Sequence, residues 1–173
     1  MALDWQNDAE YMALIEDLIE LEEVQCLKNY VHHLVTDRLS HSLSVSYRSY
    51  RWAKRFNLNT RAIARAGLLH DLFYYDSADK HQVGGKGHNW EHPRIALQNA
   101  LKITEISDLE QDIIVKHMFG ATRELPKYPE SYIVTLMDKQ AAIFELGAGF
   151  YQFCLAQSAR QSKKISEFSI IIK

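Results

Sequence analysis

The stretch that decides the fold is Ala66-Gly67-Leu68-Leu69-His70-Asp71, in which two ionisable side chains follow an apolar run. The surrounding segment, from 61 to about 73, is apolar nearly all round, which predicts a buried central helix. An imidazole and a carboxylate are costly to bury unless they pair with each other or bind a metal. For an isolated dipeptide, a satisfied buried hydrogen bond between the two is the more common arrangement.

Helical periodicity continues on both sides of this segment. Apolar residues spaced three or four apart predict one helix over about 8–37 and a second over 40–56. Beyond the central helix, Pro93 suits the first position of a helix over 94–102, and Ser107 with Glu110 forms a capping box for the next helix. A long final helix is predicted over 130–158. Residues 166–173 fit either a short strand or a frayed tail.

The composition is that of one globular domain. Hydrophobic residues make up 47% of the 173 residues and charged residues 24%, ordinary values that exclude a disordered or fibrous chain. Only 7 Gly and 3 Pro argue against an all-β fold with many turns. We therefore predict one all-α domain over 1–173, with a core over about 30–145 on which the N-terminal and C-terminal helices pack.

Charge and cysteine content exclude several classes of partner. The formal net charge of -2 provides no global field that attracts nucleic acid or anionic lipid, so neither is an expected partner. Cys26 and Cys154 lie far apart in the sequence, and they are expected to form neither a disulfide framework nor a thiolate zinc site.

No secretory signal is recognisable, and the apolar runs fall short of the ~20 residues that a membrane span needs. The expected compartment is the cytoplasm.

Further ionisable residues fall on inward faces of the predicted helices. His41 opens the helix over 40–56, His92 precedes Pro93, and His117 and Asp138 each share a face with apolar neighbours. Taken singly, each of these residues is more often structural than ligating. Taken together, they bring imidazoles and carboxylates from several helices toward one place, and such ligands suit iron, manganese or zinc.

The order His41, His70-Asp71, Asp138 resembles the HD-domain metal-dependent phosphohydrolases, whose pattern is H…HD…D on bundled helices. The flanking sequences His41-Ser-Leu-Ser-Val, Ala66-Gly-Leu-Leu-His-Asp and Thr135-Leu-Met-Asp138-Lys resemble that family too. His92-Pro-Arg-Ile-Ala-Leu and Asp112-Ile-Ile-Val-Lys-His117 resemble the subset that binds two metals. The resemblance covers roughly residues 30–145.

This resemblance implies an all-α, single-domain HD-type helical bundle with two divalent or mixed-valence transition metal ions. The expected metal is iron or manganese, with zinc, nickel or magnesium as alternatives. Asp71 would be the catalytic residue that bridges both metals. His41, His70 and Asp138 would complete one site, and His92 and His117 would serve the other. A metal-bound hydroxide would then cleave a phosphoester or phosphoanhydride bond of a nucleotide-like small molecule.

Two departures from the family pattern leave a second hypothesis open. Many members follow the dipeptide with a lysine that holds substrate phosphate, whereas here Leu72-Phe-Tyr-Tyr-Asp76 carries no cation. The chain also lacks the GYP motif of the cyclic-dinucleotide enzymes, which disfavours that substrate. The alternative is a non-catalytic, metal-stabilised nucleotide-binding or regulatory HD module. If the substrate is a phosphate ester, Arg94 and Lys127 are the expected substrate-binding cations.

The segment over 76–91 contains rival motifs. His88-Asn-Trp-Glu91-His92 spells the H-x-x-E-H pattern of a metalloprotease, which requires both histidines on one helix face. Pro93 and the preceding glycines disfavour a helix there, so His88 is predicted to be a loop histidine, with a position near the substrate or behind a metal ligand as the alternative. Gly84-Gly-Lys-Gly87 lacks the spacing of a P-loop. The roles of His32, His33 and the loop stay open, as does a homodimer formed through the N-terminal helix.

Overall fold

The centre of the molecule is the pair α3 (Arg38–Phe56) and α4 (Thr60–Leu69), seen here in a computed structural model that describes residues 4–32, 36–76 and 85–171. Asn57 ends α3 in the left-handed conformation with a φ of 53°, and the side chain of Asn59 accepts a hydrogen bond from the Ala62 N–H to begin α4. The two helices lie side by side because Gly67 has no side chain: a Cβ there would come within 2.9 Å of the Ser46 Cα.

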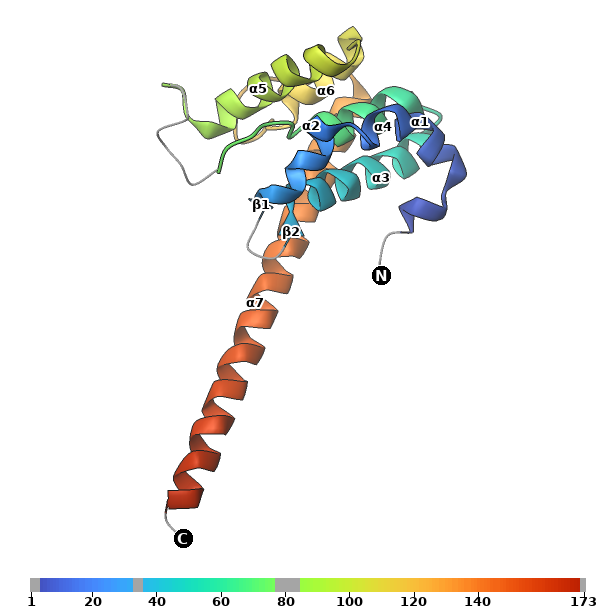
Figure 1. Cartoon of the computed structure of the whole chain (residues 1–173). Coiled ribbons are helices and arrows are strands. Elements are labelled where there is room, and N and C mark those ends of the chain that lie inside the picture. The colour runs from blue at the N-terminus through green and yellow to red at the C-terminus, as the bar shows by residue number, and fades with distance from the viewer. Residues whose placement is uncertain (1–3, 33–35, 77–84, 172–173) are drawn as a thin grey trace.

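The prediction of a buried central helix is confirmed. Every residue of α4 from Ala62 to Leu69 is buried, and α4 contacts α1 (Ala9–Ile19), α3, α5 (His88–Ile103), α6 (Asp108–Lys116) and α7 (Pro129–Ile171). Figure 1 shows these helices gathered around α4. The helix ends at Leu69, so His70 and Asp71 lie at its C-terminal end, inside the bundle.

The predicted single helix over 8–37 is wrong. Helix α1 ends at Ile19 and is followed by α2 (Glu22–Gln25), a 3-10 turn (Cys26–Asn29) and the antiparallel strands β1 (Val31–His32) and β2 (Thr36–Asp37). A further 3-10 turn, Trp5–Asn7, precedes α1. Acidic residues crowd the C-terminal end of α1, where the helix dipole disfavours negative charge, and β-branched residues suit the strands.

The N-terminal helix packs on the central pair through aromatic side chains. Tyr11 of α1 is fully buried, and its hydroxyl donates a hydrogen bond to Ser46 Oγ at 2.7 Å. The rings of Tyr47 and Tyr50 lie 4.9 and 5.2 Å from the Tyr11 ring, centroid to centroid. The Tyr11 ring therefore packs on two aromatic rings of α3, and this contact helps to hold α1 on the bundle.

Helix α5 begins six residues earlier than the sequence predicted, at His88 instead of Arg94, and includes Pro93. The prediction of a loop is therefore wrong for the stretch from His88 to His92, whereas residues 77–84 lie outside the described residues. A proline within a helix loses one hydrogen bond to the carbonyl four residues earlier. Burial of His92, Pro93, Ala96 and Ala100 on one face of α5 outweighs that loss.

The last two helices complete the bundle. The capping box is confirmed, because Ser107 Oγ accepts from the Glu110 N–H while the Glu110 carboxylate accepts from the Ser107 N–H. The predicted helix over 130–158 extends as α7 to Ile171, so residues 166–171 are helical. The first turns of α7 pack on α3 and α6.

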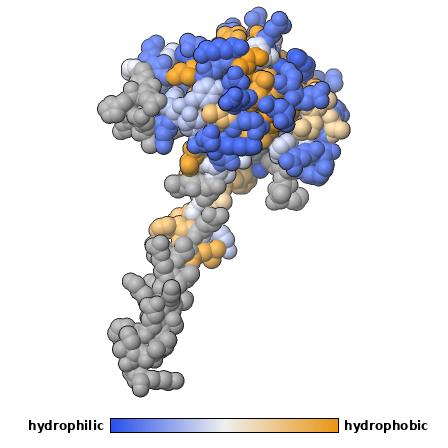
Figure 2. Space-filling model, viewed as in Figure 1, coloured by the Kyte–Doolittle hydropathy of each residue, from blue (hydrophilic) through white to orange (hydrophobic). Residues whose placement is uncertain are grey.

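The rest of α7 projects from the bundle, and the C-terminus lies far from the N-terminus (Figure 1). Its apolar side chains are exposed there, including Ile143 at 67% and Phe150 at 70%. Figure 2 shows hydrophobic residues gathered where α7 leaves the bundle. Among the described residues, no helix has the length and apolarity that a membrane crossing requires.

Candidate metal centre

The structure brings together all the residues that the sequence singled out as metal ligands. His41 comes from α3, His70 and Asp71 from the end of α4, and His92 from α5, while His117 ends α6 and Asp138 lies on α7. Candidate ligand atoms of His41, His70 and Asp138 all lie within 4.8 Å of one another, as do those of His70, Asp71 and His117. We call these six side chains the metal cluster. They are buried except for Asp138, which is half-buried.

Backbone carbonyls orient three of the imidazole rings. The Nδ1 atoms of His70, His92 and His117 lie 2.8 Å from the carbonyl oxygens of Gly67, His88 and Ile114, respectively. A carbonyl oxygen can only accept, so each Nδ1 carries the proton and each Nε2 presents a lone pair to the cluster. Metal-ligating histidines are characteristically held in this way by the ring nitrogen that does not bind the metal.

His41 is oriented by a carboxylate that sequence reasoning missed. Its Nε2 lies 3.0 Å from Asp138 Oδ1, and its Nδ1 lies 2.9 Å from Glu145 Oε1. The Glu145 side chain is only 11% exposed. Glu145 falls two helical turns after Asp138, on the same face of α7 and among apolar residues, and that spacing is the signal that points to it.

Asp71 stands between two subsets of imidazoles. Its Oδ1 lies 3.3 Å from His92 Nε2 and 3.6 Å from His117 Nε2, while its Oδ2 lies 3.9 Å from His70 Nε2. Asp71 Oδ1 and His70 Nε2 are buried without a hydrogen-bond partner among the described residues. Buried polar atoms are costly when unpaired. A cation contacted by both atoms would remove that cost, so the donor set fits divalent metal ions.

The pKa shifts of Asp71, Asp138 and His117 favour the deprotonated form that binds a metal, whereas the neighbouring carboxylates raise the pKa of His70 and of His41. Burial alone would raise the pKa of Asp71, but the neighbouring His70 and His92 hold it well below its ordinary value. Burial lowers the pKa of His117 to about 3. Burial opposes protonation of His41 as well, yet Asp138 and Glu145 raise its pKa to about 10. A metal ion bound by His41 would therefore take the place of a proton.

A buried guanidinium lies behind the cluster, and sequence reasoning missed it as well. Arg38 is fully buried, and its Nη1 and Nη2 donate hydrogen bonds to the carbonyls of Phe73 at 2.7 Å and Tyr75 at 3.1 Å. Its guanidinium carbon also lies 3.6 Å from the centroid of the Phe73 ring. Arg38 thus holds the segment that follows the His-Asp dipeptide, and its donors are directed at the protein's own carbonyls.

His88 is the first residue of α5 and lies directly against the cluster, so its assignment to a loop is wrong. Its ring stacks on that of His92 at 4.4 Å between centroids, and its Nδ1 lies within hydrogen-bond distance of the Tyr75 hydroxyl, at 3.1 Å. Burial lowers the pKa of His88 to about 4. Both histidines of the H-x-x-E-H motif therefore lie on one face of α5, and the Nε2 of His92 is directed at His117 and Asp71, so His92 belongs to the metal cluster.

A pocket of about 480 Å³ opens beside His88. Its wall carries the cations Lys86 and Arg123 together with Trp90, and its other lining residues are Gly87, His88, Asn89, Ala121 and Thr122. The Lys86 Nζ lies 4.5 Å from the centroid of the Trp90 ring. Because His88 stacks on His92, this pocket adjoins the metal cluster.

The two expected substrate-binding cations lie in different surroundings. Arg94 stacks on Trp90 at 3.6 Å and pairs with Glu124 at 2.6 Å. The main-chain N–H of Lys127 donates to Asp112 Oδ2 at 2.9 Å, near the junction of α6 and α7. In the described part of the chain, neither side chain contacts the metal cluster, and their roles stay predictions.

The two neighbouring histidines whose roles stayed open are not part of the metal cluster as defined above. His32 lies in β1, and His33 lies outside the described residues.

A comparison with protein families finds a match to the HD domain over residues 38–143. The matched span is more than half of the chain and contains the whole metal cluster. No curated protein matches the chain.

Proposed function

The chain belongs to the HD-domain family, whose members are mostly metal-dependent phosphohydrolases, and on that premise we propose that it is a binuclear enzyme of this kind. Its substrate would be a nucleotide-like small molecule with a phosphoester or phosphoanhydride bond. The observation that carries the proposal is the position of Asp71, whose two oxygens are directed at different imidazoles of the metal cluster.

We propose that the residues of the cluster form two metal sites that share Asp71. His41, His70 and Asp138 would hold one ion, His92 and His117 the other, and Asp71 would contact both. Two divalent ions, when bound, make water more acidic and stabilise the charge that develops on phosphoryl oxygens. Nitrogen and oxygen ligands of this kind suit iron or manganese, with zinc, nickel or magnesium as alternatives.

The chain itself orients the histidine rings of the cluster and keeps bulk water away from them. The carbonyls of Gly67, His88 and Ile114 fix three rings, and Glu145 fixes a fourth. Burial of the cluster in the helical bundle excludes bulk water from these side chains, which strengthens their electrostatic effect on a bound phosphate. Rigid helices preserve this geometry better than loops do.

The pocket beside His88 is the proposed substrate site. Lys86 and Arg123 supply positive charge for a phosphate group, and Arg94 holds Trp90 in the pocket wall. Lys127 borders a separate pocket of about 280 Å³, so it is proposed to act only on a substrate long enough to reach there.

One observation favours the alternative, a non-catalytic metal-stabilised nucleotide-binding or regulatory module. The segment after the His-Asp dipeptide has no cation of its own, and the buried Arg38 that holds this segment donates to its carbonyls. Such a module would bind metal and ligand without releasing phosphate.

The deciding experiment is phosphate release by protein loaded with iron or manganese in the absence of oxygen. Substrates should include phosphomonoesters, nucleoside di- and triphosphates and dinucleoside polyphosphates. We expect turnover of at least one class, and loss of several orders of magnitude in Asp71→Ala. Far-UV circular dichroism of this variant should stay helical, because the core packing of α4 does not depend on Asp71.

Two results would count against the enzyme. A wild-type protein with two metals per chain that cleaves no compound of the panel would favour the non-catalytic module. Full activity of Asp71→Ala after metal depletion would rule out the mechanism.

A further inference from the structure

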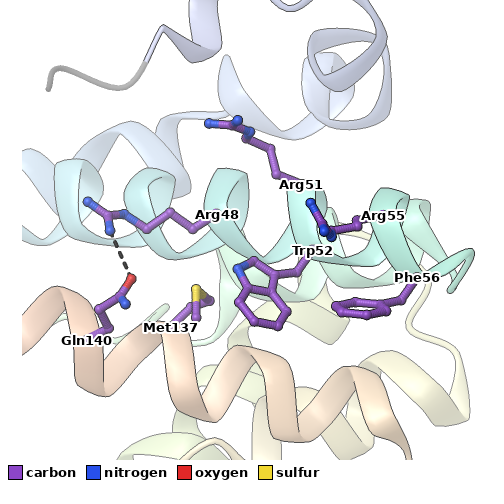
Figure 3. Close-up of a pocket in the computed structure, with 7 residues that line it drawn as sticks. All are labelled: Arg48, Arg51, Trp52, Arg55, Phe56, Met137 and Gln140. Carbon is purple, nitrogen blue, oxygen red and sulfur yellow. Dashed lines mark hydrogen bonds between the residues drawn. The ribbon is translucent and has the colours of Figure 1, made fainter.

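A groove on the surface of α3 and α7 has features that the metal cluster does not explain. Arg48, Arg51, Trp52, Arg55 and Phe56 of α3 line it together with Met137 and Gln140 of α7 (Figure 3). We call it the arginine groove. Its volume of about 870 Å³ lies within the range of small-molecule sites. None of its lining residues belongs to the metal cluster.

Two aromatic side chains form the apolar part of the arginine groove. Trp52 and Phe56 are 43% and 53% exposed, and their ring centroids lie 5.4 Å apart at an interplanar angle of 37°. Both rings point from α3 toward α7 (Figure 3). One helical turn separates the two residues, so they share a face of α3. Large aromatic rings normally bury most of their area, and these two leave a flat apolar surface open to a planar ligand.

Three arginines supply positive charge around this pair. Arg48 Nη1 donates to Gln140 Oε1 at 3.0 Å and its Nε donates to Ser44 Oγ at 3.2 Å, both neutral partners. Arg55 lies beside Trp52, whereas Arg51 turns to the other side of α3 (Figure 3). In the described part of the chain the arginine ion pairs belong to Arg65 and Arg94, so none of the three forms an ion pair there.

We propose that the arginine groove binds a free nucleotide at a site separate from the metal centre. The base would stack on Trp52 and Phe56, and the phosphates would be bound by Arg48 and Arg55. Guanidinium groups match phosphate because their planar donors form paired hydrogen bonds. Aromatic rings stack on any base through its π face. The proposal does not depend on the hydrolytic activity.

A free nucleotide fits better than a nucleic acid strand. Binding of single strands relies on basic residues that follow the backbone over several nucleotides. The chain has a formal net charge of -2, and residues 143–155 of α7, beyond the groove, include no Lys or Arg and expose apolar side chains such as Ile143 and Phe150. The basic residues of the groove are therefore not continued along this part of α7, as the binding of a strand would require.

Calorimetric titration of the full-length protein in excess EDTA tests the proposal, because EDTA keeps metals out of the cluster. The probes are the four ribonucleoside triphosphates, adenosine and tripolyphosphate. We expect one triphosphate per chain to bind, with adenosine and tripolyphosphate each at least tenfold weaker than ATP. Trp52→Leu should weaken ATP and adenosine by tenfold or more. Arg55→Gln should weaken ATP and tripolyphosphate but leave adenosine unchanged.

Two control variants make the result specific. Arg61→Gln removes the same charge from an exposed position of α4 and should bind ATP like the wild type. Asp71→Ala should also bind ATP normally in EDTA, since it lies in the metal cluster. The proposal is overturned if no triphosphate binds, if Trp52→Leu and Arg55→Gln bind like the wild type, or if Asp71→Ala abolishes binding. It is also overturned if a twelve-nucleotide single strand binds at least tenfold more tightly than ATP.

Discussion

The Nε2 atoms of His92 and His117 lie 2.9 Å apart, although the Nδ1–H of each ring already faces a backbone carbonyl. Two neutral rings in this state direct lone pairs at each other, which is unfavourable unless a proton or a cation lies between them. Asp71 Oδ1, at 3.3 and 3.6 Å from these nitrogens, adds a negative charge at the same point. The arrangement is suited to a bound cation, and the first prediction follows from it.

Metal content is predicted to be about two ions per chain for protein prepared with iron or manganese without oxygen. His117→Ala removes a ligand from one set only, so the metal content should fall toward one while His41, His70 and Asp138 keep the other ion. Elemental analysis of the purified proteins measures this. A wild-type protein that never exceeds one ion in excess metal would contradict the binuclear centre.

Glu145→Gln is predicted to weaken metal binding by about 10- to 100-fold, the usual effect of losing a partner that orients a ligating histidine. The amide keeps the shape of the side chain but no longer offers the His41 Nδ1–H a charged acceptor. Titration against a competing chelator measures the affinity. Glu105→Gln, which changes an exposed acid, is the control and should match the wild type. Equal affinities of the two variants would remove Glu145 from the site.

Gly67→Ala is predicted to lower the free energy of unfolding by about 1–3 kcal/mol, the usual cost of overpacking. The added Cβ would come within 2.9 Å of the Ser46 Cα, so α3 and α4 would have to separate. Gly147→Ala in α7 meets no atom within 4 Å and should instead raise the free energy by up to about 1 kcal/mol. Urea unfolding of both variants is the measurement, and equal shifts would show that the helix contact does not require glycine.

Asp17→Asn is predicted to destabilise the protein at pH 7 but not in acid. The hydrogen bond from Arg65 lowers the pKa of Asp17 in the folded state. The carboxylate therefore stabilises the fold above its unfolded pKa of about 3.9, and this contribution disappears as the pH falls through the lower folded value. Because Asp17 is 56% exposed, we expect only ~0.5–1 kcal/mol at pH 7.

The measurement for Asp17 is urea unfolding of wild type and variant from pH 7 down to pH 3. Their difference in free energy should shrink toward zero at the acid end. Glu16→Gln changes an exposed neighbour on the same helix and should show no such dependence. A difference that is constant with pH would mean that the ion pair with Arg65 does not contribute.

Features set by neighbouring residues were readable from the sequence. The end of α3 at Phe56 and the capping box of Ser107 and Glu110 depend on contacts within a few residues, and the structure has them where the sequence predicted them. The order of histidines and aspartates was also visible, because each falls on the apolar face of its own segment. These signals were sufficient for the all-α class and for the family.

Other features depend on residues distant in sequence, and only the tertiary structure decided them. The partner of Glu145 is His41, 104 residues away, and Arg38 holds carbonyls 35 and 37 residues away. The start of α5 at His88 overrides the local preference around Pro93, because burial of His92 and Ala96 against the bundle is worth more than one lost hydrogen bond. Likewise, the arginines and aromatic rings of α3 become a groove only because Met137 and Gln140 of α7 form its opposite wall. Periodicity shows which face of a helix is apolar, whereas packing determines which other helix that face meets.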